Sequence, residues 1–139
     1  MNPPSHPLST ARSAISVVLV TYNSAPDVAQ TAASVAAQLQ VGDELIVIDN
    51  GSSDDTIDLV LQSAPGTHVV RQSNVGFASG CNAGAQIAHG DLLMFLNPDA
   101  LLEPGALELL RAHAQQEPSW DAWQPLITLA DQSLVNTAG

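Results

Sequence analysis

The sequence contains no lysine, and three arginines are its only permanently cationic side chains. Fourteen aspartates and glutamates give the 139 residues a formal net charge of -11. A chain with this balance repels phosphate backbones and anionic membranes, so we do not expect it to bind nucleic acid. The absence of lysine excludes P-loop kinases and ATPases, Schiff-base enzymes, and any site that holds a phosphate with an ammonium group. Any anion bound by this protein must therefore be neutralised in another way.

Cysteine and long apolar runs are also scarce. The single cysteine, Cys81, excludes an internal disulfide framework and a cysteine-rich zinc site. The longest strongly apolar run, at 15–20, is far too short to cross a bilayer, so no membrane span is predicted. Residues 1–14 contain three prolines and no apolar segment typical of a signal peptide. We therefore predict a flexible tail at 1–14, followed by one domain at 15–139 that is large enough to bury a core.

Short runs rich in β-branched residues alternate with segments of helical periodicity. Helices are predicted to begin near Ser24, where a capping-box pattern and a proline coincide, and after Asp54 or Asp55. A third helix is predicted to end at Ile87, and Pro104 is predicted to open a fourth. This alternation predicts an α/β fold, with a mostly parallel sheet and helices on both of its faces. Strands are predicted at Ile15–Thr21, Leu45–Ile48, His68–Arg71 and Leu92–Leu96, and a hairpin at Leu126–Leu129 and Leu134–Val135.

Polar residues follow each of the four predicted parallel strands. Taken singly, each group could be an ordinary turn or helix cap, and the glycines at 76, 80 and 84 could serve close helix packing. Open parallel sheets, however, bind ligands outside the carboxyl ends of their strands, and four polar ends at one edge favour a binding site. The four groups are Thr21-Tyr22-Asn23, Asp49-Asn50-Gly51-Ser52, Asn74-Val75-Gly76 and Asn97-Pro98-Asp99.

These residue types suit a nucleotide. A carboxylate or an amide carbonyl at the end of the second strand can accept a hydrogen bond from the imide N–H of a pyrimidine. Tyr22 offers a flat face for a base. A diphosphate needs positive charge, which this sequence lacks, so we expect a divalent metal to supply it. Asp99 is a hard oxygen ligand suited to Mg²⁺ or Mn²⁺.

Four segments in this order and spacing, 18–23, 47–56, 74–84 and 95–99, resemble family 2 glycosyltransferases. The resemblance covers Ile15 to Leu110 and is closest to the rhamnosyltransferase-like branch. It implies a Rossmann-like GT-A fold and an NDP-sugar donor, for example dTDP-rhamnose. It also implies inverting transfer to a saccharide or lipid-linked acceptor in cell-surface polysaccharide synthesis. The implied location is the cytoplasm, at the inner face of the membrane.

The resemblance assigns roles residue by residue. Thr21 and Tyr22 would line the base pocket, and Asn50, where many members carry aspartate, would contact the base. Asn82 would lie beside the donor, and Asp99 would bind the metal. Asn97 stands at the first position of a degenerate Asp-x-Asp motif. The complete predicted donor-binding set is Thr21, Tyr22, Asn23, Asp49, Asn50, Ser52, Gly76, Asn82, Asn97 and Asp99, with Asp99 as the metal ligand.

One other interpretation stays open, because a nucleotide-sugar-binding module without catalysis would show the same motifs. A phosphoacceptor receiver domain is excluded, since it needs a lysine and this sequence has none. In the resembled family the catalytic base lies well beyond the metal motif. We therefore expect the base to lie beyond Gly139, and the chain to be a donor-binding part that is inactive alone. The carboxylates that follow Asp99 here, none within a recognisable motif, are Glu103, Glu108, Glu117, Asp121 and Asp131.

Overall fold

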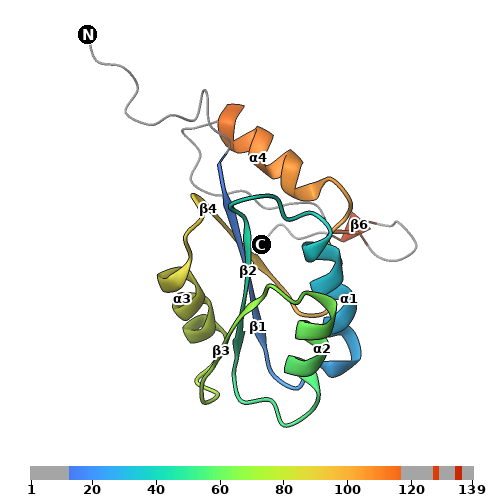
Figure 1. Ribbon diagram of the computed structural model, residues 1–139, viewed down its shortest axis with the longest axis vertical. Helices are drawn as coiled ribbons and strands as arrows, with labels where there is room; N and C mark the ends of the chain where they lie inside the picture. The colour runs from blue at the N-terminus through green and yellow to red at the C-terminus, as the bar shows by residue number, and fades with distance from the viewer. Residues whose placement is uncertain (1–12, 117–126, 129–133, 136–139) are drawn as a thin grey trace.

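A computed structural model describes residues 13–116, 127–128 and 134–135. Four strands form a parallel sheet in the order β3-β2-β1-β4 (Figure 1). The predicted parallel sheet is confirmed, and the second strand is one residue longer at each end than expected. The strands are β1 (Ile15–Thr21), β2 (Glu44–Asp49), β3 (His68–Arg71) and β4 (Leu92–Leu96).

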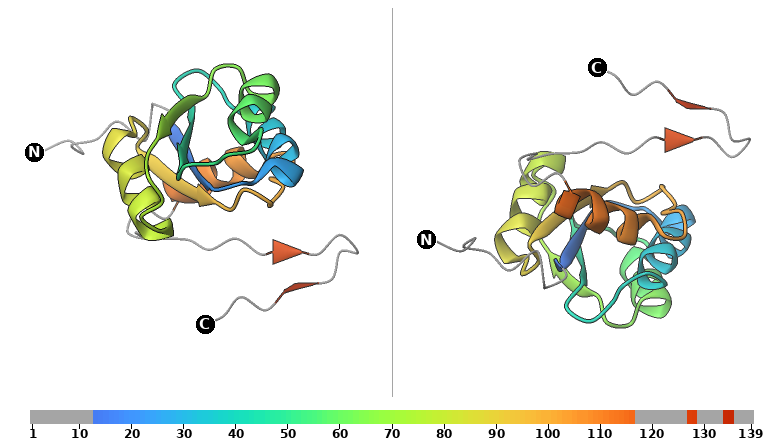
Figure 2. Two further views of the ribbon diagram at one scale, coloured as in Figure 1. Left: turned by 90° about the horizontal axis from the view of Figure 1, so that it is seen from below. Right: turned by 90° about the horizontal axis from the view of Figure 1, so that it is seen from above.

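Helices cover both faces of this sheet, as predicted. α1 (Ala25–Ala36), α2 (Thr56–Ser63) and α4 (Ala106–Gln116) pack on one face, and α3 (Phe77–Ile87) packs on the other. The two views of Figure 2 show α3 on the opposite side of the sheet from α1 and α2. No helix in the described ranges is long and apolar enough to cross a membrane.

The two faces of the central strands fill two separate cores. Every residue of β1 is buried, because β1 lies between β2 and β4 with helices on both sides. Alternate side chains of a strand point to opposite faces. One core therefore contains Ile15, Val17 and Leu19 against α1, α2 and α4, and the other contains Val18, Val20, Ile46 and Ile48 against α3.

α3 approaches β1 so closely that glycine is required at two positions. A Cβ atom on Gly84 would lie 2.4 Å from Cγ1 of Val18, and one on Gly80 would lie 2.6 Å from Cγ1 of Val20. The packing interpretation of these two glycines is confirmed. Gly76 differs, because it has open space around it and a φ of +99°, which favours glycine as the residue preceding α3.

Local details depart from expectation at the first helix. α1 begins at Ala25, directly after Ser24 as predicted, and ends at Ala36. The Ser24 hydroxyl bonds to the backbone of Tyr22 and makes no capping bond, so the capping-box prediction is wrong. The C-terminal hairpin is confirmed, with β5 (Ile127–Thr128) antiparallel to β6 (Leu134–Val135). Residues 1–12 of the predicted tail, and Glu117, Asp121 and Asp131, lie outside the described residues.

A buried ion pair closes the amino end of the sheet. Arg111 of α4 donates to both carboxylate oxygens of Asp43, at 2.9 and 3.0 Å, and to the Ser13 carbonyl at 2.8 Å. Burial raises the pKa of Asp43, but bonds from Arg111, Ile15 and Gln40 outweigh it, so the pKa is lowered overall. One of the three arginines therefore serves the fold at the end of the sheet opposite to the predicted site.

Candidate functional site

All four parallel strands end at the same edge of the sheet, which we call the rim. The rim carries residues 21–23, 49–52, 72–76 and 97–99. The chain passes from one face of the sheet to the other between β3 and β4, so the switch point of this topology lies between β1 and β4. Sheets of this class bind ligands outside such a point. The rim is therefore the candidate site.

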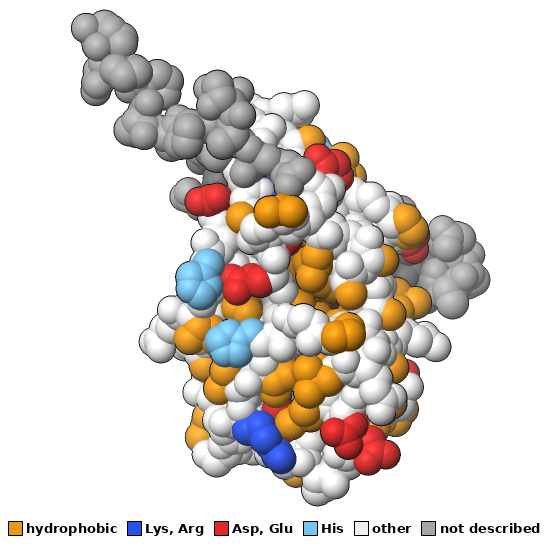
Figure 3. Space-filling view, in the orientation of Figure 1, with side chains coloured by type: hydrophobic (Ala, Val, Ile, Leu, Met, Phe, Trp, Pro, Cys, Tyr) orange, Lys and Arg blue, Asp and Glu red, His pale blue; other side chains and the backbone are white. Residues whose placement is uncertain are grey.

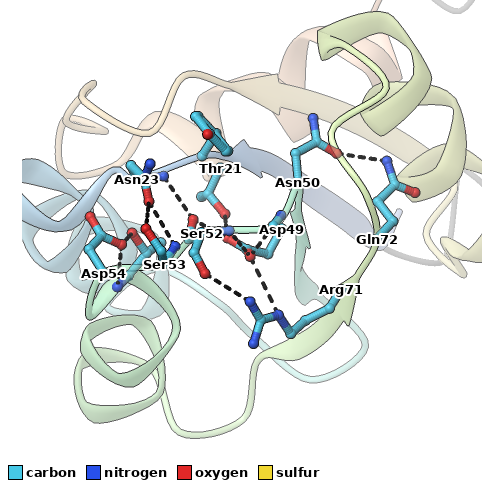
Figure 4. Close-up of polar contacts among 12 residues, drawn as sticks. Thr21, Asn23, Asp49, Asn50, Ser52, Ser53, Asp54, Arg71 and Gln72 are labelled. Atoms are coloured by element: carbon cyan, nitrogen blue, oxygen red, sulfur yellow. Dashed lines mark hydrogen bonds and ion pairs between the residues drawn. The ribbon is translucent and has the colours of Figure 1, made fainter.

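Asp49 is a buried hub beneath the rim (Figure 4). Its carboxylate, which is fully buried, accepts bonds from the hydroxyls of Thr21 (2.7 Å) and Ser52 (2.6 Å). It also accepts from the backbone N–H of Ser52 and Gly51, and the Arg71 Nε lies 3.7 Å away. Burial raises the pKa of Asp49, but the bonds from Ser52 and Thr21 more than offset it and lower the pKa overall. The ionised carboxylate thus holds the ends of β1, β2 and β3 together.

The loops after β1 and β2 are joined by reciprocal hydrogen bonds. The Asn23 N–H donates to the Ser52 hydroxyl at 2.8 Å, and the Asn23 side-chain oxygen accepts from the Ser53 N–H at 2.9 Å. The Ser24 N–H donates to the Thr56 hydroxyl at 2.8 Å. Asn23 has a φ of +48°, in the left-handed region that asparagine tolerates better than most residues. These bonds fix the β1 and β2 part of the rim before any ligand arrives.

Asn50 lies on the other side of β2 from Asp49, toward α3 (Figure 4). Its N–H donates to the Thr21 carbonyl at 2.8 Å, and its side-chain Nδ2 donates to the Gly76 carbonyl at 3.2 Å. Its Oδ1 accepts from Nε2 of Gln72 at 2.8 Å. Gln72 was not among the predicted site residues. The strand register of the structure shows why Gln72 belongs to the site, because Arg71 pairs with Asp49 and Gln72 therefore follows beside Asn50.

The part of the rim after β4 is built differently. Asn97 and Asp99 are exposed, and their side chains make no hydrogen bond to any described residue. Backbone contacts hold this loop to α1, since the Thr31 hydroxyl donates to the Pro98 carbonyl at 2.8 Å. No cluster of three or more metal-binding side chains exists among the described residues. Asp99 fits the mode in which Mg²⁺ takes one or two carboxylates and completes its shell with phosphate oxygens and water.

The structure groups some predicted site residues and separates others. Asn82 lies on α3 between Gly80 and Gly84, which face β1, so its exposed side chain points away from the sheet. Tyr22 is also exposed, at 53%. Tyr22, Asn82, Asn97 and Asp99 contribute no side chain to the hydrogen-bond network of the rim. The side chain or backbone of each remaining predicted residue does contribute: Thr21, Asn23, Asp49, Asn50, Ser52 and Gly76.

Positive charge is scarce around the rim. The Arg71 side chain is 60% exposed, and its Nη2 donates to the Ser52 carbonyl at 2.8 Å. Arg111 is buried at the far end of the sheet, and Arg12 lies outside the described residues. Figure 3 shows the molecule in the orientation of Figure 1. On the visible face, basic side chains occupy one small area, whereas acidic side chains are spread over it. A bound diphosphate would therefore have few cationic side chains near it, as the composition predicts.

A parallel sheet of this order, with a polar rim and helices on both faces, is a Rossmann-like arrangement, and solved GT-A glycosyltransferases share it. S. aureus TarS in complex with UDP-GlcNAc shares this fold, with a TM-score of 0.69 and 23% identity. That match covers 75% of this chain and 32% of the solved TarS chain, which comprises residues 1-349 of TarS. A mannosyltransferase from Pyrobaculum calidifontis in complex with GDP-Man and Mn²⁺ shares it with a TM-score of 0.65 and 26% identity. The second match covers 75% of this chain and 32% of the mannosyltransferase.

The chain belongs to glycosyl transferase family 2, whose family model matches residues 16–127. It is 33% identical over 98 residues to an uncharacterized glycosyltransferase of Nostoc sp., covering 68% of this chain and 30% of that protein. The chain spans about a third of the length of the curated relatives it matches. The family and fold expected from the four motifs are thus confirmed.

Proposed function

We propose that this chain forms the donor-binding part of a glycosyltransferase that moves a sugar from a nucleoside diphosphate sugar to an acceptor hydroxyl with inversion. The observation that carries the proposal is that the polar strand ends of a family 2 chain share one rim. The relatives TarS and the Pyrobaculum mannosyltransferase, in complex with UDP-GlcNAc and with GDP-Man and Mn²⁺, support a nucleotide-sugar donor.

Each part of the donor has a proposed partner on the rim. Asn50 hydrogen-bonds the base, and the exposed ring of Tyr22 offers it an apolar face. Asp99 holds Mg²⁺ or Mn²⁺, with Asn97 beside it in sequence. The metal, when bound, neutralises charge on the diphosphate, which Arg71 alone cannot do. The loops that meet the donor keep their shape through hydrogen bonds beneath the rim, which join Asp49 to Thr21 and Ser52.

The finer assignments rest on the motif resemblance. We propose dTDP-rhamnose as the donor and a saccharide or lipid-linked acceptor, in cell-surface polysaccharide synthesis at the cytoplasmic face of the membrane. We also propose that residues 15–139 act as one donor-binding domain.

No described carboxylate after Asp99 suits the role of the base. Glu108 accepts bonds from Gln40 and Arg111, which places it near the amino end of the sheet and away from the rim. Glu103 lies in the loop before α4, where its carbonyl accepts from the Gln38 side chain. A base must lie within hydrogen-bond reach of the acceptor hydroxyl. We therefore propose that the base lies outside residues 13–116. On the strength of the motif resemblance, we also propose that the 139-residue chain binds donor without turning it over.

Titration calorimetry with UDP and dTDP tests the donor site, in Mn²⁺ and in a chelator. We expect tighter binding in Mn²⁺, and we expect Asp99→Ala to abolish that difference. Asn50→Ala should weaken binding in both conditions. Asp58→Ala, which removes an exposed carboxylate on α2, is the matched control and should bind as the wild type does.

Three outcomes would count against the proposal. Failure to bind UDP and dTDP both in Mn²⁺ and in the chelator would overturn the proposed function. Equal binding with and without metal would remove Asp99 from its role. Sugar transfer by the chain alone, assayed with labelled NDP-sugars and saccharide acceptors, would show that the base lies within these 139 residues.

A further inference from the structure

We propose that Gln72 is a positioning residue that fixes the orientation of the Asn50 amide. Through Asn50, Gln72 would select nucleobases whose ring nitrogen carries a proton at the contact point. This inference rests on the proposed function, because it assumes that Asn50 meets the base of a nucleoside diphosphate.

The orientation of the Asn50 amide follows from its two side-chain partners. The Gly76 carbonyl can only accept, so the group facing it at 3.2 Å must be the Nδ2 amine. Oδ1 then faces Gln72, whose Nε2 donates to it at 2.8 Å. With Gln72 as it stands, a flip of the Asn50 amide would place its oxygen against the Gly76 carbonyl and its amine against the Gln72 amine. The backbone N–H of Gln72 donates to the Asp49 carbonyl at 2.8 Å, which holds residue 72 beside Asn50.

Fixing this amide has a chemical consequence. Oδ1 of Asn50 keeps a second lone pair, which can accept from the ring N–H of uracil, thymine or guanine. Cytosine and adenine present an acceptor nitrogen at the equivalent position. A freely rotating asparagine would pair with either kind of base by turning its amide. An asparagine whose amide is held by Gln72 and Gly76 accepts a hydrogen bond from uracil, thymine or guanine. Its oxygen repels the ring nitrogen of cytosine or adenine.

The same contacts explain why an amide, rather than a carboxylate, suits position 50 of this chain. A carboxylate there would set an anionic oxygen against the Gly76 carbonyl in place of the donor that now faces it. Two oxygens that can only accept would then face each other at this contact. The Gly76 carbonyl, the Asn50 amide and the Gln72 amide therefore form one matched chain of donors and acceptors.

The test compares the affinities for UDP and CDP, measured by calorimetry in Mn²⁺ on the 139-residue chain. Wild type should prefer UDP. Gln72→Ala should lower the UDP-to-CDP preference about three- to tenfold, the loss of one neutral hydrogen bond. Gln72→Glu should lower it further, because a carboxylate facing Oδ1 favours the flipped amide. Gln72→Met keeps the length without the donor and should match Gln72→Ala. Gln62→Ala, on the exposed side of α2, is the control and should keep the wild-type preference.

The preference ratio separates positioning from a general loss of structure, because partial unfolding lowers both affinities together. In an Asn50→Ala background, Gln72→Ala should leave the ratio unchanged, and a further fall would overturn the role of Asn50 as intermediary. Wild-type preference for UDP that survives in Gln72→Ala and Gln72→Glu would overturn the inference and leave the proposed function standing. Equal wild-type affinity for UDP and CDP would also overturn it. Failure of wild type to bind any nucleoside diphosphate would instead overturn the proposed function.

Discussion

Asp49 at the end of β2 and Asp99 in the loop after β4 both belong to the rim, yet the chain uses the two carboxylates in opposite ways. Asp49 is fully buried, and four donors from its own and the neighbouring loop satisfy it. Asp99 is exposed and bonds to no side chain or backbone group that the structure describes. The Asp49 carboxylate is thus fully used by hydrogen bonds within the structure, whereas the Asp99 carboxylate is open to solvent.

This difference separates two kinds of polar residue that look alike in a sequence. A buried carboxylate that loses its donors costs free energy of unfolding, because no water replaces them. An exposed carboxylate costs almost nothing to remove. Stability and binding measurements on matched variants should therefore divide the rim into a supporting part and a binding part.

The largest effect is expected from Asp49→Ala. The substitution leaves the Thr21 and Ser52 hydroxyls and two backbone N–H groups without their acceptor. We expect it to lower the free energy of unfolding by about 3 kcal/mol or more, measured by urea denaturation. Asp49→Asn, which keeps one acceptor oxygen, should lose less. A loss below about 1 kcal/mol would contradict the role of Asp49 as a hub.

Gly84→Ala should cost less, because it strains packing and leaves every hydrogen bond of the rim in place. The new Cβ would lie 2.4 Å from Cγ1 of Val18, so α3 must move away from β1. We expect a loss of about 1–3 kcal/mol in thermal or urea unfolding. Adding Val18→Ala should recover part of it. If the double variant is instead less stable by the sum of the two losses, close packing is not the reason for this glycine.

Acid should weaken both ends of the sheet. The pKa of Asp49 at the rim and that of Asp43 at the opposite end are both lowered in the folded chain, so the unfolded chain binds more protons below about pH 4. The stability these carboxylates contribute is present above that pH and is lost as pH falls through their folded pKa values. We expect Asp49→Asn to flatten the fall of stability with acid, measured by urea denaturation at a series of pH values. A slope identical to wild type would show that Asp49 has an ordinary pKa.

The smallest effect on stability is expected from Asp99→Asn. Removing an exposed charge should change the free energy of unfolding by less than about 0.5 kcal/mol. The same variant should lose the Mn²⁺ dependence of nucleotide binding. A variant that is clearly destabilised but still responds to Mn²⁺ would reverse the contrast between Asp49 and Asp99.

Most of the fold could be predicted from the sequence, because the bounds of strands and helices depend on local residue patterns. β1, β3 and β4 have the bounds that their apolar runs indicate, and the glycine spacing of α3 matches its contact with β1. Contacts between distant loops were invisible. Asn50 and Gln72 are 22 residues apart, and Arg111 and Asp43 are 68 apart. Such pairs become visible only once the strand register is known. The partner of the Ser24 hydroxyl was missed for a local reason, because a capping residue and a residue that bonds its own loop share one sequence pattern.

The scarcity of cations at the rim also bears on how fast a ligand arrives. A chain of charge -11, with Arg71 as the exposed arginine of its described residues, repels a free nucleoside diphosphate and attracts divalent cations. We therefore expect association to become faster as monovalent salt screens this repulsion, the reverse of the usual behaviour of phosphate-binding proteins. Stopped-flow mixing over a range of salt concentrations would reveal it, and a rate that falls with salt would contradict it. Under physiological conditions the encounter would then be between this protein and a metal–nucleotide complex, whose reduced charge makes it the species able to approach.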